Sequence, residues 1–376
     1  MDTGHFFDFV IRRIKRKVCD LISFCDFLHN KISPKSVLIV ELNECHAELL
    51  PSYSYYFRKL GFNVEIVAAP KYKGFLPELF ANKIYHFTVT GAKNIFKLNK
   101  INRYKFIIFT SYVLYHKSPD KKRKISKVFE HFKMNKTLKV KTGIVVHDLG
   151  DIDNNLEGCL GIIVLSKILS ENTGEDLSAI NPCYFKDNAP KDKNKITTFV
   201  TVGRLEDKRK NSRLLFDTVK KLAKSGVNNF RIMAAGDNTK DNIPSDLRQF
   251  ILPLGRLDFN SLYKVLEAAD FFLPLLDPDF NEHLRYIQSG TSGSFQLIRG
   301  FLLPPLVHNF FGEKYGFNYD NSILYKNNED FLDALKTAIN MENAEYLTMQ
   351  NNILSNRTEI QDNSICALMK LLNKHH

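Results

Sequence analysis

Short apolar runs alternate with segments of helical spacing over most of this chain, and no other feature restricts its fold as strongly. Residues 36–42, 64–68, 106–109, 142–146 and 161–165 are such runs, rich in Val and Ile and bounded by polar residues or glycine. Strands that are separated by helices are typical of a parallel sheet covered by helices on both faces. The pattern therefore predicts an α/β fold built on doubly wound sheets.

A polar stretch at residues 186–195 contains almost no apolar side chain and predicts an interdomain linker. The alternation then restarts, with expected strands at 196–202, 230–235, 250–254, 271–276 and 305–308 and helices at 212–224, 260–269 and 294–301. A chain of 376 residues is long enough for two domains. We predict a basic amphipathic helical extension (1–34), two Rossmann-like domains that face a cleft (35–187 and 188–345) and a C-terminal closing helix (346–376).

The N-terminal segment 5–28 repeats apolar residues at helical spacing, with basic residues between them at 12–17. A cationic amphipathic helix of this kind can lie on an anionic membrane surface, and a helix packed on the protein's own surface explains the pattern equally well. No apolar stretch is long enough to span a bilayer, and no cleavage site of a secretory leader follows the basic run. We therefore expect a cytoplasmic protein with a peripheral place at the inner face of the cell membrane as one option.

The formal net charge of +12 indicates an acidic partner only where basic residues cluster, at 12–17, 121–124 and 208–210. A solvated face is the ordinary explanation for any one of these runs. No recognised module or interleaved basic and aromatic face is present, so nucleic acid is not expected as a partner. The six cysteines form no CxxC pair, which predicts reduced thiols and no zinc site.

Ligands of doubly wound sheets bind beyond the carboxyl ends of the strands, so polar loops that follow strands are the candidates for a site. One such loop carries Gly203, Arg204 and Lys210, where a tight turn precedes two cations that can grip the oxygens of one diphosphate. Another loop lies directly ahead of the helix at 294–301, where small residues and free backbone amides can bind an anion. A flexible turn with a serine N-cap explains this second loop as well. Its residues are Ser289, Gly290, Thr291, Ser292, Gly293 and Ser294.

Two further loops offer groups for proton transfer. His147 and Asp148 follow the strand at 142–146, and Glu44 and His46 follow the first strand. A structural histidine explains the first pair equally well, and helix capping explains the second. Two Asp-x-Asp sequences, at 151–153 and 277–279, have a spacing that suits Mg²⁺, but so short a motif is common by chance, and we predict no metal site.

The order of these motifs resembles that of GT-B glycosyltransferases, and most nearly the family-4-like group that uses nucleotide sugars. The likeness runs over residues 35–340 and includes Val202-Gly203-Arg204-Leu205 with Lys210-Asn211, and Ala269-Asp270-Phe271-Phe272-Leu273-Pro274. The first domain adds Val145-Val146-His147-Asp148 and Ile163-Val164-Leu165-Ser166. The family usually has two glutamates eight positions apart. Here the partner position of Glu282 is Gly290. The family's usual pattern therefore does not predict the donor contacts or the stereochemical outcome for this chain.

The resemblance implies transfer of a sugar from a nucleotide-diphosphate sugar to a glycan or a lipid-linked oligosaccharide, in the synthesis of a surface polysaccharide such as capsule or lipopolysaccharide. It implies that Arg204 and Lys210 neutralise the leaving diphosphate, that Glu282 and the Ser/Gly loop contact the donor, and that no metal is required. The acceptor would meet Glu44, His46, His147 and Asp148, one of which acts as a base if configuration is inverted. A nucleotide-sugar epimerase of the same fold and a non-catalytic binding subunit are the alternatives.

Overall fold

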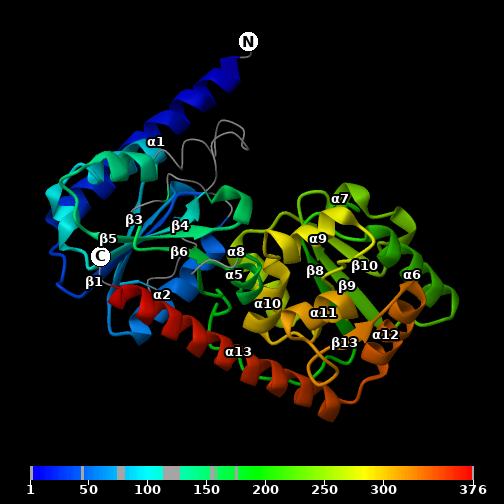
Figure 1. The fold of residues 1–376 in the computed structure, drawn as a ribbon. Helices are drawn as coiled ribbons and strands as arrows, with labels where there is room; N and C mark the ends of the chain where they lie inside the picture. The colour runs from blue at the N-terminus through cyan, green and yellow to red at the C-terminus, as the bar shows by residue number, and fades with distance from the viewer. Residues whose placement is uncertain are drawn as a thin grey trace. The chain divides into compact units, whose positions relative to one another are not determined.

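The computed structural model divides the chain into two compact units, which we describe separately (Figure 1). Unit 1 contains Met1–Pro182 and Asp362–His376, and unit 2 contains Cys183–Gln361. The structure describes residues 3–43, 46–73, 81–112, 128–152, 156, 159–173 and 177–374, with side chains from residue 11 onward. Glu44, the basic cluster at 121–124 and Asp153 lie outside the described residues.

Unit 1 contains a seven-stranded sheet in which every described pairing is parallel, in the order β3-β2-β1-β4-β5-β6-β7. Strand order reverses between β1 and β4, so the carboxyl ends of these two strands form the switch point of the sheet. The strands are β1 (Ser36–Glu41), β2 (Asn63–Ala68), β3 (Lys83–His86), β4 (Phe106–Tyr112), β5 (Lys141–Val146), β6 (Gly161–Val164) and β7 (Ser178–Ala179).

Helices flank this sheet because its central strands are apolar on both faces. Every residue of β1 and β4 is buried, as expected for strands covered from both sides. The helices are α1 (Thr3–His29), η1 (Ala47–Leu49), α2 (Leu50–Lys59), η2 (Pro70–Tyr72), α3 (Val89–Ile95), η4 (Asn99–Arg103), η6 (Leu149–Asp151) and α5 (Lys167–Thr173).

Unit 2 repeats the same design with a parallel sheet in the order β10-β9-β8-β11, and a bridge between Phe272 and Pro305 continues it to β12 and β13. Here the order reverses between β8 and β11. The strands are β8 (Thr197–Val202), β9 (Phe230–Ala235), β10 (Ile251–Gly255), β11 (Phe271–Phe272), β12 (Leu306–His308) and β13 (Ile323–Tyr325).

The helices of unit 2 include α6 and α12, whose apolar residues share one core with the sheet. The last helix, α13, begins in unit 2 and ends in unit 1. The helices are α6 (Ser212–Lys224), α7 (Thr239–Asn242), η8 (Ser245–Leu247), α8 (Phe259–Ala268), α9 (Asn281–Gln288), α10 (Gly293–Phe301), α11 (Asn309–Tyr315), α12 (Asn328–Asn340) and α13 (Asn343–Asn373).

The polar stretch at 186–195, expected to be a linker, lies within unit 2 and is fixed to it by hydrogen bonds. The Lys193 ammonium donates to the carbonyls of Ile339 and Met341, and the Asn194 side chain donates to Asp270. Its polar side chains therefore fix the segment to unit 2 by hydrogen bonds.

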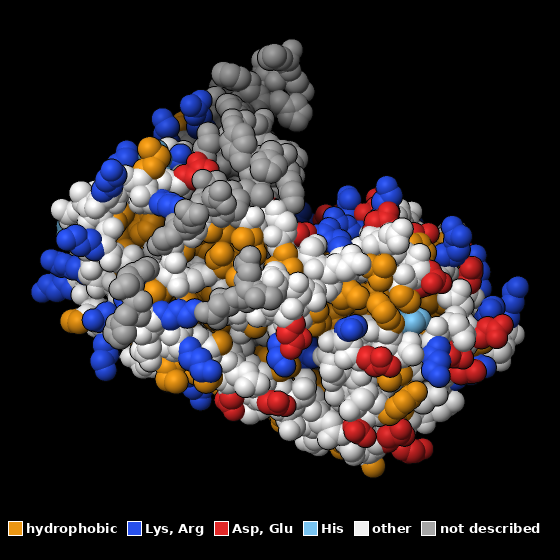
Figure 2. Space-filling view, viewed as in Figure 1, with side chains coloured by type: hydrophobic (Ala, Val, Ile, Leu, Met, Phe, Trp, Pro, Cys, Tyr) orange, Lys and Arg blue, Asp and Glu red, His pale blue; other side chains and the backbone are white. Residues whose placement is uncertain are grey.

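Basic residues are distributed unequally over the two units. The basic and acidic residues of unit 2 nearly balance, so almost the whole excess of the +12 net charge lies in unit 1. Figure 2 shows Lys and Arg over the visible face of unit 1 with few acidic side chains, whereas both signs are mixed over unit 2. Among the described residues, no helix is both long and apolar enough to cross a bilayer.

Candidate functional site

The loop after β8 places a buried cation at the switch point of unit 2. Gly203 directly follows β8 and has a φ of +119°, a conformation that favours glycine. A Cβ on Gly236, at the end of the neighbouring β9, would overlap the Gly203 carbonyl oxygen. Two glycines therefore let the ends of β8 and β9 approach each other closely.

Lys210 lies in this loop and is only 5% exposed. Its ammonium Nζ donates to the carbonyl oxygen of Pro274, just beyond β11, at 2.8 Å. No described carboxylate forms an ion pair with it, and burial lowers its pKa to about 7. A buried cation without a counter-charge is costly, so an anionic ligand at this position would relieve the cost.

The other predicted donor residues surround this part of unit 2. Arg204 is exposed, with its Nη1 3.5 Å from Glu206 Oε1. Glu282 is exposed in the first turn of α9. Ser289 ends that helix, and Ser292 is the N-cap of α10 without a side-chain cap hydrogen bond.

The start of α10 has room for a ligand. A Cβ placed on Gly293 would meet no atom within 4 Å, so the helix start borders open space at this residue. The N–H of Ser292 donates to the Tyr315 hydroxyl at 3.5 Å. Gly290 and Ser294 are buried, and Thr291 is half-buried. The arrangement is compatible with an anion at this helix N-terminus.

His283 is a buried neighbour of Lys210 that the sequence reasoning missed. It is fully buried, its Nδ1 accepts from the backbone N–H of Asp277 at 3.0 Å, and the Phe280 ring stacks on it at 5.0 Å. Burial lowers the pKa of His283, and the charge of Lys210 acts in the same direction. Its burial depends on the packing of α9, and no motif in the sequence marks it.

The switch point of unit 1 carries an acid buried at the end of β1. Glu41 is fully buried, and its carboxylate accepts from the backbone N–H of Asn43 at 2.6 Å and from the hydroxyls of Thr110 and Ser111 at 2.8 and 2.7 Å. Burial raises the pKa of Glu41 to about 8 in spite of these donors. The sequence reasoning missed Glu41, although an acid within the apolar run 37–42 is itself a signal.

Beside Glu41, the structure brings together His46 and His147, two of the predicted catalytic residues. Their rings lie 4.0 Å apart between centroids, with an interplanar angle of 35°. His147 Nε2 is 2.8 Å from the carbonyl oxygen of Thr110, so this nitrogen carries the proton and donates it. Asp148 has a local role, because its Oδ1 accepts from the backbone N–H of Gly150 at the start of η6.

Glu48 completes this cluster and is the second acid that the sequence reasoning missed. His46 Nδ1 lies 3.3 Å from Glu48 Oε1, while the buried Glu48 Oε2 has no hydrogen-bond partner among the described residues. Burial raises the pKa of Glu48 to about 7, and the nearby His147 opposes the shift. A carboxylate beside one imidazole nitrogen orients the ring and directs proton acceptance to the other nitrogen.

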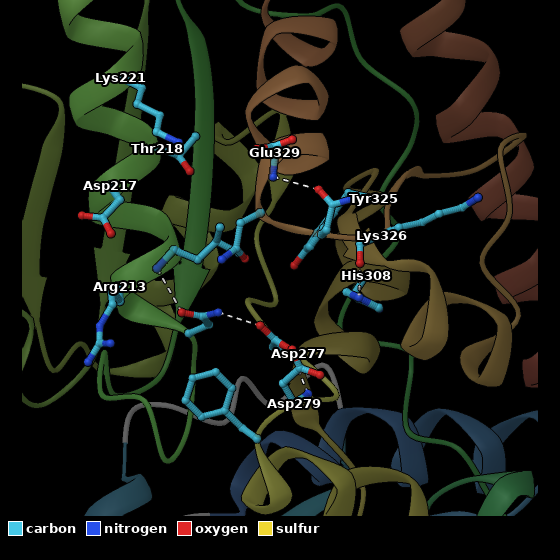
Figure 3. A pocket seen from close by; sticks show the side chains of 15 residues that line it. Arg213, Asp217, Thr218, Lys221, Asp277, Asp279, His308, Tyr325, Lys326 and Glu329 are labelled. Atoms are coloured by element: carbon cyan, nitrogen blue, oxygen red, sulfur yellow. Dashed lines mark hydrogen bonds between the residues drawn. The ribbon is translucent and has the colours of Figure 1, made fainter.

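Unit 2 also contains a cavity of about 530 Å³ between α6, the loop after β11 and the N-terminus of α12 (Figure 3). None of the predicted donor residues lines it. Asp277 connects the cavity with the buried cluster, because its Oδ2 accepts from the Asn211 side chain at 2.7 Å and its backbone N–H bonds to His283. Within the described ranges, no group of three or more His, Cys, Asp or Glu residues is placed to hold a metal ion.

No protein-family model and no curated protein matches this sequence. Several solved structures are similar to this chain over 90% or more of its length, at sequence identities of 11–14%. TarM has a TM-score of 0.61 at 11% identity and covers 91% of this chain and 100% of its own. An α-glucosyltransferase solved with UDP and a 13-mer DNA containing an HMU base has a TM-score of 0.63 at 14% identity, with 90% and 99% covered.

A third structure, HepE of Anabaena in complex with UDP and glucose, has a TM-score of 0.59 at 13% identity and covers 90% of this chain and 99% of its own. At such identities the likeness is one of fold. The two parallel sheets with reversed strand order and these structural neighbours together show that the chain has the GT-B glycosyltransferase fold.

Proposed function

We propose that this protein is a glycosyltransferase that moves a sugar from a nucleotide-diphosphate sugar to a glycan or lipid-linked oligosaccharide acceptor. The observation that carries the proposal is Lys210, a buried ammonium without an acidic partner at the switch point of unit 2. The fold supports it, since HepE and the α-glucosyltransferase were each solved with UDP.

On the donor side, the diphosphate supplies the counter-charge that Lys210 lacks. Gly203 lets the backbone come close to the ligand, and Arg204 can leave its exposed ion pair with Glu206 at little cost. The amides of Gly293 and Ser294 add hydrogen-bond donors, whereas that of Ser292 donates to the Tyr315 hydroxyl. Negative charge builds on the diphosphate as the bond to the sugar breaks, so these groups stabilise the transition state more than the ground state.

On the acceptor side, we propose that the His46–Glu48 pair accepts the proton of the acceptor hydroxyl. The acceptor hydroxyl attacks the anomeric carbon of the sugar, its proton passes to His46 Nε2, and the nucleoside diphosphate leaves with the electrons of the broken C–O bond. Glu48 orients the imidazole and balances its charge, because its carboxyl lies against Nδ1. This assignment applies to an inverting reaction; in a retaining reaction the leaving phosphate takes the proton.

The test is a panel of UDP-, GDP- and other nucleotide sugars, with binding measured by calorimetry and turnover by nucleotide release. Lys210→Met is expected to weaken nucleotide binding about 10- to 100-fold, the range for loss of a hydrogen bond to a charged group. The matched control is Lys208→Met, because Lys208 is exposed in the same loop. Equal binding by both variants would overturn the donor site.

The same panel separates the alternatives. Nucleotide release that depends on an added acceptor supports a transferase. Conversion of the sugar without acceptor identifies an epimerase, and binding without turnover identifies a binding subunit.

A surface polysaccharide such as capsule or lipopolysaccharide is the product that we propose, made at the inner face of the cell membrane. The support comes from α1. Its exposed apolar side chains include Ile14, Leu21 and Ile22, at 56–63% exposure, and its basic residues at 12–17 are exposed as well. Apolar side chains next to cations match an anionic lipid surface.

A further inference from the structure

A tyrosine hydroxyl that has no hydrogen-bond partner among the described residues borders the cavity of unit 2. Tyr325 ends β13 and is 3% exposed, yet its hydroxyl forms no hydrogen bond with any described residue. Figure 3 shows the side chain directed into the cavity. The hydroxyl is therefore available to donate to, or accept from, a ligand that occupies the cavity.

The orientation of Tyr325 is fixed by its neighbours. Its ring centroid lies 4.9 Å from that of Phe331 in α12 and 5.5 Å from that of His308 at the end of β12. Such aromatic contacts hold the ring in place. The Tyr325 side chain therefore loses little conformational entropy when its hydroxyl binds a ligand in the cavity.

The charges that line the cavity argue against an anionic ligand. Carboxylates and permanent cations nearly balance, so a phosphate would meet acidic oxygens on several sides. The acids are Asp217, Asp277, Asp279 and Glu329, and the cations are Arg213, Lys221 and Lys326.

A ligand rich in hydroxyl groups fits this lining better. Each hydroxyl both donates and accepts, so it can use carboxylates, amides, ammonium groups and the Tyr325 hydroxyl together. The Asp277 carboxylate is held in place by Asn211 and by the backbone N–H of Asp279, and Phe280 adds an apolar surface. The volume of about 530 Å³ lies within the usual range for small-molecule sites.

We propose that this cavity binds a neutral saccharide, with the Tyr325 hydroxyl as a direct hydrogen-bond partner. The site is separate from the donor residues around Lys210, none of which lines it. It therefore adds a carbohydrate site to unit 2 that the transfer reaction itself does not require.

The experiment uses the full chain with its tyrosines replaced by 3-fluorotyrosine and observed by ¹⁹F NMR. The resonance that disappears in Tyr325→Phe reports on the cavity. Glucose, galactose, N-acetylglucosamine and lactose are the probes, each up to about 50 mM, which populates even a site with a millimolar Kd. UDP is the anionic comparison.

At least one saccharide is expected to shift the Tyr325 resonance, and UDP is not. In unlabelled protein, Tyr325→Phe is expected to bind that saccharide about five- to tenfold more weakly, the effect of one hydrogen bond, and to bind UDP normally. Tyr319→Phe is the matched control, because Tyr319 is 70% exposed in the same unit.

Lys210→Met separates this proposal from the donor site, since it is expected to weaken UDP binding about 10- to 100-fold and to keep saccharide binding. The proposal is overturned if no probe shifts the Tyr325 resonance, if UDP shifts it as strongly as a sugar, or if Tyr325→Phe binds the saccharide as well as the unaltered protein does.

Discussion

At the scale of single residues, the two units place a buried acid and a buried base at equivalent points. Glu41 ends β1 in unit 1, and Lys210 follows β8 in unit 2; each lies where strand order reverses. Glu41 accepts three hydrogen bonds from its own unit, whereas Lys210 has only a backbone carbonyl. We infer that Glu41 is satisfied within the fold and that Lys210 needs a ligand.

The raised pKa of Glu41 predicts how stability depends on pH. The pKa is about 8 in the folded chain against 4.5 as the ordinary value, so between these values the folded state binds more protons than the unfolded state. The free energy of unfolding therefore falls as pH rises from about 5 to 8, by up to about 1.4 kcal/mol per pH unit for one group. Glu41→Gln is expected to flatten this fall in denaturant titrations at several pH values.

Glu171→Gln, a change of an exposed glutamate on α5, is the control and is expected to keep the slope of the unaltered protein. An unchanged slope in Glu41→Gln would contradict the prediction. Glu48, with a pKa of about 7, adds a fall in the same direction.

The proposed role of the His46–Glu48 pair predicts how substitutions there change the rate of transfer. His46→Ala is expected to reduce acceptor-dependent nucleotide release about 10²- to 10⁴-fold, the usual contribution of a general base. Glu48→Gln is expected to reduce kcat by a smaller factor and to alter the pH profile, while KM for the donor changes little.

His131→Ala is the control for loss of an imidazole, because His131 is exposed. If Glu48→Gln keeps both the rate and the pH profile, Glu48 does not act through His46. If only His147 variants lose activity, the proton belongs to His147.

At the scale of elements, α1 has two different halves. Its second half packs on unit 1: the Asp20 carboxylate accepts from the Thr88 hydroxyl and backbone N–H, the Ser23 hydroxyl donates to the His86 carbonyl oxygen, and Phe27 is fully buried. The first half extends beyond the rest of the unit (Figure 1). Packing on the protein and binding to lipid, which the sequence left as alternatives, are thus both available to one helix.

Flotation with liposomes tests the lipid contact of α1. The protein is expected to float with phosphatidylglycerol vesicles and much less with phosphatidylcholine vesicles, because the charge at 12–17 needs an anionic surface. A triple change of Ile14, Leu21 and Ile22 to Ser is expected to reduce flotation while leaving the fold intact, since these side chains are exposed.

Met134→Ser, which removes an apolar side chain that is 77% exposed elsewhere in unit 1, is the control. Equal flotation of the triple variant and this control would contradict a role for α1. Substitution is sharper than deletion of the helix, because deletion also removes Phe27 from the core.

Elements with a strong apolar pattern could be predicted closely from the sequence. Helix α6 and strand β9 have the expected bounds, since their apolar positions have a clear period. The expected strand at 271–276 stops as β11 at Phe272, because Pro274 lacks an N–H for pairing and Leu275 has a φ of +54°. The short strands β3, β7 and β13 were missed because tertiary pairing defines them more than their own residues do.

At the scale of the whole molecule, the order of elements was enough to predict the fold, but it was not enough to predict the site in full. The loops that follow the strands lie at the carboxyl edges of the sheets: Lys210 lies near the switch point of unit 2, and His147 follows β5 and contacts β4 beside the switch point of unit 1. Glu41, Glu48 and His283 were missed, because burial and the partners of a side chain depend on contacts between distant segments.

Helix α13 carries the chain from unit 2 back into unit 1, and its last turns complete the first unit. Leu371 lies against Gly161, and the Lys374 carbonyl oxygen accepts from Lys141 Nζ at 3.0 Å. A ribosome makes these residues after all of unit 2, although most of unit 1 emerges before it. During synthesis, unit 2 therefore has its full set of residues before unit 1 does, and a premature stop codon within α13 would damage the unit that contains the earlier residues.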